Sequence, residues 1–324
     1  MCEDVNTVDV RKPFLPARYV NLIWLLVLGT LWGSSYLFIK IVVTEIPALT
    51  LVAGRLLVAS VAMWVIVRVL GIKMPQSWRM WRTYALLGFL GAAVPYALIT
   101  WGEQYIPSGL ASLLQSTTPI FALLLAQFVP NDDHITLSKV AGVIVGFVGV
   151  GLLMWPDLRE GWGDLGAQKA LLGQLAIVGS SLCYALTAIL AGKQLRGQHP
   201  LCSATGQLSM GAVYALIGAL LTGSSFDLSL SGKAWASWAG LIFFGTILAY
   251  GIYFTLIERG GATYATTVTY IIPVNGLLLG ALVLGESLNL TTWISLLLIL
   301  GGVLLVRGRE GQEHRPVEAQ DAAP

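Results

Sequence analysis

The chain carries the stretch SGLASLLQSTTP at residues 108–119, and 154 residues later it carries ATYATTVTYIIP at residues 262–273. At this one shift, residues 85–127 lie on residues 239–281 without a gap. The most telling aligned pairs are Gly91 with Gly245, Tyr96 with Tyr250 and Pro119 with Pro273. Apolar composition alone would produce some matches, but paired glycines, tyrosines and prolines at a single shift indicate an internal duplication.

Composition predicts that the chain lies in a membrane. Of its 324 residues, 56% are hydrophobic and 11% are charged, whereas soluble domains have about 25% charged residues. These values exclude a soluble enzyme, a disordered chain, a collagen and a disulfide scaffold. The net charge of +2 gives no argument for nucleic acid. The three cysteines and three histidines match no disulfide or metal spacing, so we expect no cofactor and no metal.

Ten segments are long and apolar enough to cross a bilayer, which requires about 20 residues. Turns are expected between them where glycine, proline and polar residues gather, for example at Gly260-Gly261. The predicted fold class is therefore an all-α integral membrane protein with ten transmembrane helices. The expected spans are 20–41, 48–70, 80–100, 108–129, 137–155, 171–191, 202–222, 234–256, 264–285 and 290–306.

The distribution of positive charge predicts the orientation of these spans. Most lysines and arginines fall in segments on the same side as the two termini. The lysines and arginines expected on the side opposite the termini are Lys40, Arg159, Lys169 and Lys233. Because cytoplasmic loops carry the excess of positive charge, we expect both termini in the cytoplasm and the chain in the cell membrane.

The duplication divides the chain into two halves of five spans each. The first repeat is expected at 20–155 and the second at 171–306, joined by an extracytoplasmic linker at 156–170. The cytoplasmic tails are then 1–19 and 307–324. Because each half has an odd number of spans, the two repeats insert with opposite orientation. Inverted repeats are a common plan of transporters, with the substrate site between the halves. The alternative is a duplicated bundle without a path through it.

Four stretches resemble the EamA branch of the drug/metabolite transporter superfamily. They are Leu31-Trp32-Gly33-Ser34-Ser35, Ala53-Gly54-Arg55-Leu56, Ala111-Ser112-Leu113-Leu114-Gln115 through Pro119, and Ala265 through Pro273 to Gly285-Glu286. The resemblance covers residues 20–306. One departure is that the acidic residue usual after the fourth span appears here as Asp132-Asp133.

This resemblance implies two inverted five-helix repeats around a central cavity. Such carriers move small metabolites, amino acids or drugs, often outward, by alternating access and without ATP. The sequence agrees with the last point, because it contains no GxxxxGK[ST] loop for a nucleotide.

A polar stripe that ends at a proline occurs once in each half. Helical spacing places Ser108, Ser112, Gln115 and Pro119 on one face of the fourth span. In the ninth span, Thr266, Thr269 and Pro273 correspond to Ser112, Gln115 and Pro119. We expect Ser112, Gln115, Thr266 and Thr269 to bind substrate and the two prolines to act as hinges, because proline disrupts the preceding helical turn. The alternative is that these polar groups only join helices by hydrogen bonds.

Arg55 is the charged residue deepest within a predicted span. An arginine at the centre of a membrane helix costs about 2.5–3.5 kcal/mol and therefore faces protein or water. One interpretation makes it the counter-charge for a carboxylate or phosphate on the substrate. The other makes it a structural residue that reaches outward towards Glu45 or Glu103.

Aromatic residues with a polar edge occur towards the middle of several spans. Such rings stack on organic solutes and also donate hydrogen bonds, although many membrane aromatics instead form interfacial belts. The predicted substrate-binding aromatics are Trp32, Tyr96, Tyr184, Tyr250 and Tyr270.

The sequence thus predicts a transporter of a small organic solute, with export favoured over import, and not an enzyme. The rival function is a membrane sensor of the same fold that binds a ligand without net transport. An enzyme acting on lipid-linked substrates would need convergent acid–base or metal residues, which are not visible. The expected partners are the small-molecule substrate and the lipid bilayer. Gly142, Gly146 and Gly149 allow close helix packing, either within the chain or against a second copy in a homodimer.

Overall fold

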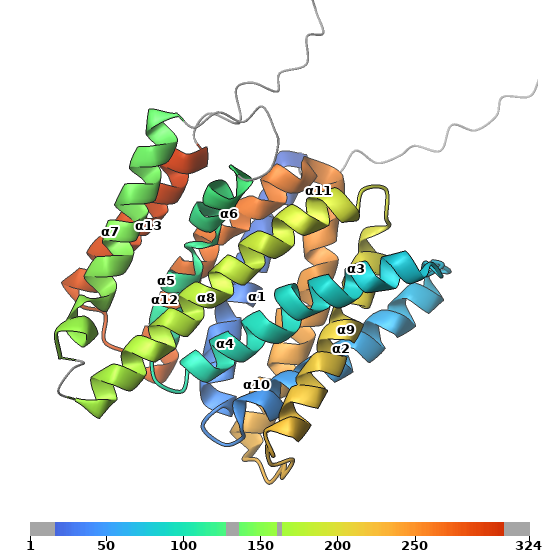
Figure 1. The fold of residues 1–324 in the computed structure, drawn as a ribbon, viewed down its shortest axis with the longest axis horizontal. Coiled ribbons are helices and arrows are strands. Elements are labelled where there is room, and N and C mark those ends of the chain that lie inside the picture. Colours follow the sequence, from blue (N-terminus) through green and yellow to red (C-terminus); the bar gives the residue numbers. More distant parts are fainter. Residues whose placement is uncertain (1–16, 128–135, 161–163, 308–324) are drawn as a thin grey trace, which may run out of the picture.

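The computed structural model describes residues 17–127, 136–160 and 164–307. These residues form a bundle of helices without a β-strand (Figure 1). Some spans contain one helix, and others contain two that are joined by a π-helical segment or, between α5 and α6, by a turn. The α-helices of the first half are α1 Ala17–Val42, α2 Ala48–Val69, α3 Trp78–Gly88, α4 Val94–Gly102, α5 Ser108–Gln115, α6 Thr118–Ala126 and α7 Leu137–Glu160. Those of the second half are α8 Leu165–Gln194, α9 Pro200–Leu221, α10 Gly232–Ile242, α11 Ala249–Ala265, α12 Ile271–Leu284 and α13 Leu290–Arg307.

Nine helical segments of the described chain are long and apolar enough to cross a membrane, and α13 contributes a shorter apolar helix over Leu290–Val306. Large apolar side chains cover the outside of the bundle. Leu282, for example, is 81% exposed and Leu297 is 70% exposed. A soluble protein rarely exposes contiguous apolar surface of this extent, whereas a bilayer requires it.

One local expectation was wrong. The turn expected at Gly260-Gly261 lies inside α11, which continues to Ala265; glycine costs a helix only about 1 kcal/mol and does not force it to end. The linker at 156–170 stays a prediction; among the described residues of that segment, α7 ends at Glu160 and α8 begins at Leu165. A membrane helix can extend past the apolar window with polar residues, which a count of apolar residues misses.

Helix irregularities recur at the duplicated positions. A π-helix, η1, occupies Phe89–Ala93, and a second, η2, occupies Phe243–Leu248, which is the same place at the 154-residue shift. Likewise, the fourth span is interrupted between α5 and α6, and a 3-10 segment, η3, occupies Thr266–Tyr270 before α12. π- and 3-10 segments are uncommon within helices and often lie at functional positions. These four interruptions are therefore candidates for a role in function.

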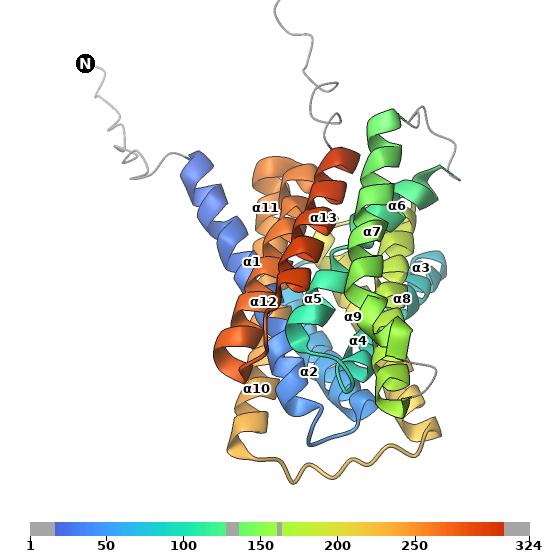
Figure 2. The same ribbon diagram turned by 90° about the vertical axis from the view of Figure 1, so that its left-hand side faces the viewer.

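The two described chain ends lie at the same end of the bundle, at the top of Figure 1 and Figure 2. We call this the terminal end and the opposite one the far end. The far end carries the turns after α1, α4, α9 and α12, and the long loop between α9 and α10 runs along its surface in Figure 2.

Helices α7 and α13 lie side by side in both views (Figure 1, Figure 2). Their glycines allow this approach: a Cβ atom on Gly142 would lie 2.6 Å from the carbonyl oxygen of Gly302, and one on Gly302 would lie 2.6 Å from that of Gly142. A Cβ on Gly149 would meet Ile299 at 2.9 Å. The glycine stripe of α7 is therefore used within the chain and gives no support to a homodimer.

Candidate functional site

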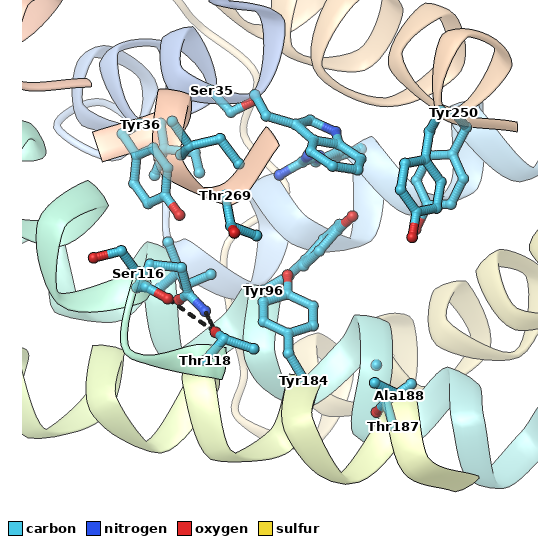
Figure 3. A pocket seen from close by; sticks show the side chains of 18 of the residues that line it. Ser35, Tyr36, Tyr96, Ser116, Thr118, Tyr184, Thr187, Ala188, Tyr250 and Thr269 are labelled. Atoms are coloured by element: carbon cyan, nitrogen blue, oxygen red, sulfur yellow. Dashed lines mark hydrogen bonds between the residues drawn. The ribbon is translucent and has the colours of Figure 1, made fainter. Parts of the chain in front are cut away.

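A cavity of about 340 Å³ lies between the two halves of the chain. Figure 3 shows it from close by, with polar side chains from both halves around it. Seven of the residues predicted from the sequence line it. They are Trp32, Arg55, Tyr96, Gln115, Tyr184, Tyr250 and Thr269. Two pairs among them, Tyr96 with Tyr250 and Gln115 with Thr269, are related by the duplication.

The two prolines explain how Gln115 reaches the cavity wall and why Thr269 lies at the equivalent point. A proline ring collides with the carbonyl four residues earlier, and α5 ends at Gln115, four residues before Pro119. The freed carbonyl of Gln115 accepts hydrogen bonds from the hydroxyls of Thr118, at 2.9 Å, and Ser181, at 3.3 Å. Pro273 stands in the same relation to Thr269, which lies in the 3-10 segment η3.

The Gln115 side chain is held in place by both halves of the chain. Its amide nitrogen donates to the Thr118 hydroxyl at 3.1 Å (Figure 3), and its amide oxygen accepts from the Ser180 hydroxyl at 2.5 Å. Ser180 belongs to α8, so this amide joins α5 and α6 to the second half. A side chain fixed in this way is pre-organised to bind a polar group in the cavity.

Arg55 places a positive charge in the cavity wall. It is 5% exposed, and its Nε donates to the Thr246 hydroxyl at 3.0 Å while Nη2 donates to the Gly245 carbonyl at 3.4 Å. Both partners lie in η2. The guanidinium carbon also lies 4.2 Å from the centre of the Tyr96 ring, a favourable cation–π arrangement. Among the described residues no carboxylate pairs with Arg55.

Neither of the outward partners considered for Arg55 binds it. Glu45 accepts hydrogen bonds from the backbone and hydroxyl of Ser231, and the Glu103 carboxyl has no hydrogen-bond partner among the described residues. The guanidinium charge is therefore neutralised by no described side chain, and it faces the cavity.

Aromatic rings form much of the remaining wall. Trp32 and Tyr253 pack together with centroids 5.3 Å apart, and both line the cavity. Figure 3 shows Tyr96 and Tyr184 close together at its centre and Tyr250 at one side. Rings with hydroxyl groups suit a solute that has an apolar body and a polar group.

Three predicted residues do not line the cavity. Ser112 is fully buried and donates to the Gly109 carbonyl at 2.8 Å, and a Cβ on Gly276 would lie 2.3 Å from its hydroxyl. Its part of the helix face therefore packs on α12. Thr266 and Tyr270 belong to η3 but lie outside the cavity wall. Asp132-Asp133 lies outside the described residues.

Other cavity residues were not predicted as binding residues. They include Ser35, Tyr36, Thr118, Thr187 and Gln207. Helical spacing could have found two of them, because Tyr36 follows Trp32 by four residues and Thr187 follows Tyr184 by three. For Gln207 no spacing argument distinguishes a binding residue from one that joins helices.

Hydrogen bonds link several helices at the far end of the bundle. The Lys40 ammonium donates to the carbonyls of Glu103, at 2.6 Å, and Ile106, at 2.8 Å. The Glu45 carboxylate accepts from the backbone and hydroxyl of Ser231 at 2.7 and 2.6 Å. The hydrogen bonds from the Ser231 side chain and backbone lower the pKa of the Glu45 carboxyl. Together these bonds join α1 to the turn after α4 and to the start of α10.

Glu286 makes another connection at the far end. Its carboxylate accepts from the backbone and hydroxyl of Ser108, at 2.7 and 2.9 Å, and from the backbone of Gly109 at 2.9 Å. These donors lie in the first turn of α5, where a negative charge also interacts favourably with the helix dipole. The turn after α12 thereby fixes the start of the helix that carries Gln115.

Glu286→Ala is expected to lower the stability of the folded chain by about 2–5 kcal/mol, because charge-assisted hydrogen bonds contribute about 1.5–3 kcal/mol each and buried donors are left unpaired. Thermal unfolding in detergent would measure the loss. Glu45→Ala is the matched control, since it removes two similar bonds at an exposed position, and we expect a much smaller change. Equal losses in the two variants would contradict the anchoring role of Glu286.

Comparisons with known proteins identify the family of the chain. The profile of the EamA-like transporter family matches residues 20–155 and again residues 171–308. An uncharacterized transporter of Archaeoglobus fulgidus is 29% identical over 86% of this chain and 95% of its own. The uncharacterized inner membrane transporter YedA of Escherichia coli is 28% identical over 92% of this chain and 95% of its own.

A solved crystal structure has the same fold, with a TM-score of 0.60 and 17% identity, over 89% of this chain and 96% of that one. The family profile covers most of the chain in two matches, and the relatives are named as transporters of the inner membrane or simply as transporters. The resemblance predicted from the sequence is thereby confirmed, as is a multi-pass location in the cytoplasmic membrane. The chain belongs to the EamA-like transporter family.

Proposed function

We propose that this transporter moves a small organic solute by alternating access through the cavity between two inverted five-helix repeats. The proposal rests on one observation: residues related by the duplication, Tyr96 with Tyr250 and Gln115 with Thr269, line the same cavity from both halves of the chain. A site between inverted repeats is exposed first to one side and then to the other as one repeat rocks against the other.

The orientation follows from positive charge in the loops, which places the terminal end in the cytoplasm and the far end outside. The hydrogen bonds of Lys40, Glu45 and Glu286 then close the outer side. In this arrangement a solute enters from the cytoplasm, and the far end opens to release it. Pro119 and Pro273 serve as hinges, because each frees the helical backbone beside a cavity residue.

The wall chemistry indicates the class of solute. Arg55 provides a positive charge, the tyrosines and Trp32 provide rings, and Gln115 provides an amide. A volume of about 340 Å³ is at the small end of ligand pockets. An amino acid, or a metabolite with an acidic group and an apolar body, fits these three properties, and export is the proposed direction.

Gln115→Leu is expected to lower solute flux by roughly two- to tenfold, because one hydrogen bond contributes about 0.5–1.5 kcal/mol to binding. Liposomes containing the purified chain are loaded with a mixed pool of amino acids and organic acids, and mass spectrometry measures what leaves. Gln127→Leu, at the end of α6 and outside the cavity, is the matched control and should retain flux.

Two results would count against this account. Equal losses of flux in Gln115→Leu and Gln127→Leu, or loss of folded protein in parallel with flux, would assign Gln115 to helix packing alone. Binding of a solute by folded wild-type protein without any flux would favour the sensor function instead.

A further inference from the structure

A buried acidic residue, Glu103, lies just beyond the cavity. It follows directly after the span that ends at Gly102. Its side chain is 0% exposed, and neither carboxyl oxygen has a hydrogen-bond partner among the described residues. Buried carboxylates without hydrogen bonds are strongly unfavourable, and such a group normally takes up a proton instead. The transport path proposed above assigns no task to this carboxyl.

Helix α4 connects Glu103 to the cavity. Tyr96, Ile99 and Glu103 follow one another at spacings of three and four residues and therefore share a helix face. Tyr96 and Ile99 line the cavity, so Glu103 is the next residue along that face, at the closed far end. Tyr36, another cavity residue, interacts electrostatically with the Glu103 carboxyl.

The charged groups around Glu103 are occupied by other contacts. Lys40 on α1 donates its ammonium hydrogens to the backbone carbonyls of Glu103 and Ile106. Arg55 on α2 binds Thr246 and Gly245, and Glu286, after α12, binds the start of α5.

The net effect of this environment favours the protonated form. Burial raises the pKa of the Glu103 carboxyl well above its ordinary value, Lys40 and Arg55 lower the pKa, and the negative charge of Glu286 raises it further. Burial is the largest of these effects. The closed far end therefore holds Glu103 as a neutral acid.

We propose that Glu103 is the proton-binding site that couples solute export to proton entry. The inference rests on the proposed transport function. When the far end opens, Lys40 leaves the two carbonyls and water reaches the carboxylate, which takes one proton from outside. Closure then buries the neutral acid. When a solute then enters the cavity from the cytoplasm, the O–H bond breaks towards water in the cavity and the proton goes to the cytoplasm. The buried carboxylate left behind favours reopening with solute bound.

This linkage has a definite sign. Because the closed state without solute binds one proton more than the open state, falling pH favours the closed far end and rising pH favours the open one. One proton changes the ratio of the two states by up to about tenfold per pH unit. Wild-type flux should therefore vary with external pH by up to that factor, and protons should enter as solute leaves.

The test compares wild type with Glu103→Gln, which keeps the shape of the side chain but cannot ionise. Liposomes hold the mixed pool of amino acids and organic acids together with a trapped pH-sensitive dye. We expect Glu103→Gln to lose the pH dependence of flux and the internal acidification. Glu160→Gln, an exposed acid at the end of α7, should retain both. Unchanged pH dependence and proton entry in folded Glu103→Gln would overturn the proposal.

A second measurement is independent of any solute. Infrared difference spectra of the reconstituted wild type should show the band of a protonated carboxyl at neutral pH, and Glu103→Gln should lack this band. Should that variant not fold, Glu103→Asp should move the band instead. A protonated-carboxyl band that neither substitution changes would contradict proton binding at Glu103, even if the wild type transports solute. Absence of flux in wild type would contradict only the transport function, since the spectra still decide the state of Glu103.

Discussion

Arg55→Gln is expected to lower the flux of an acidic solute by at least tenfold while a neutral solute of the same shape loses much less. The guanidinium is 5% exposed, faces the cavity and has no carboxylate partner among the described residues. A hydrogen bond to a charged group contributes about 1.5–3 kcal/mol, which corresponds to roughly ten- to 150-fold in affinity. Glutamine keeps a donor for Thr246 but removes the charge.

The measurement uses paired solutes, glutamate with glutamine and aspartate with asparagine, in liposomes that contain wild type or variant. Arg68→Gln is the matched control, because Arg68 lies on the same helix α2 and is exposed. Equal weakening of the acidic and neutral member of each pair would assign Arg55 to the packing of α2 on η2 and remove it from substrate recognition.

The sequence predicted the parts of this structure that depend on local chemistry. Apolar length located the spans, and the 154-residue shift located the two interrupted helices, because a proline acts on the turn before it wherever it occurs. The inward aromatics Trp32, Tyr96, Tyr184 and Tyr250 line the cavity as expected. They were predicted because they lie towards the middle of their spans, and the same argument selected Tyr270, which does not line the cavity.

The remaining site residues depend on contacts between distant parts of the chain. Ser112 shares a helix face with Gln115, but α12 covers that part of the face because Gly276 has no side chain. Spacing within one helix does not reveal which neighbour covers it. The contact of Lys40 with the carbonyls of Glu103 and Ile106 joins residues 63 and 66 positions apart. No sequence pattern indicates that an ammonium group will bind there, so the isolation of the Glu103 carboxyl could not be predicted.

The central claim is that the solute passes through the cavity, and Ala188 offers a direct way to close it. Ala188 lies on α8 and lines the cavity beside Tyr184 and Thr187 (Figure 3). A tryptophan at this position would occupy much of a volume of about 340 Å³. Gly192, one turn further along α8, is exposed, and a Cβ there would meet no atom within 4 Å. The same large side chain can thus be placed inside the path or outside it.

The decisive measurement is efflux of the mixed pool of amino acids and organic acids from liposomes that contain equal amounts of folded wild type, Ala188→Trp or Gly192→Trp. The account predicts that one class of solute leaves through wild type and Gly192→Trp, and that Ala188→Trp reduces its efflux to the level of empty liposomes. Wild-type efflux through folded Ala188→Trp would show that the solute takes another path and would contradict the account.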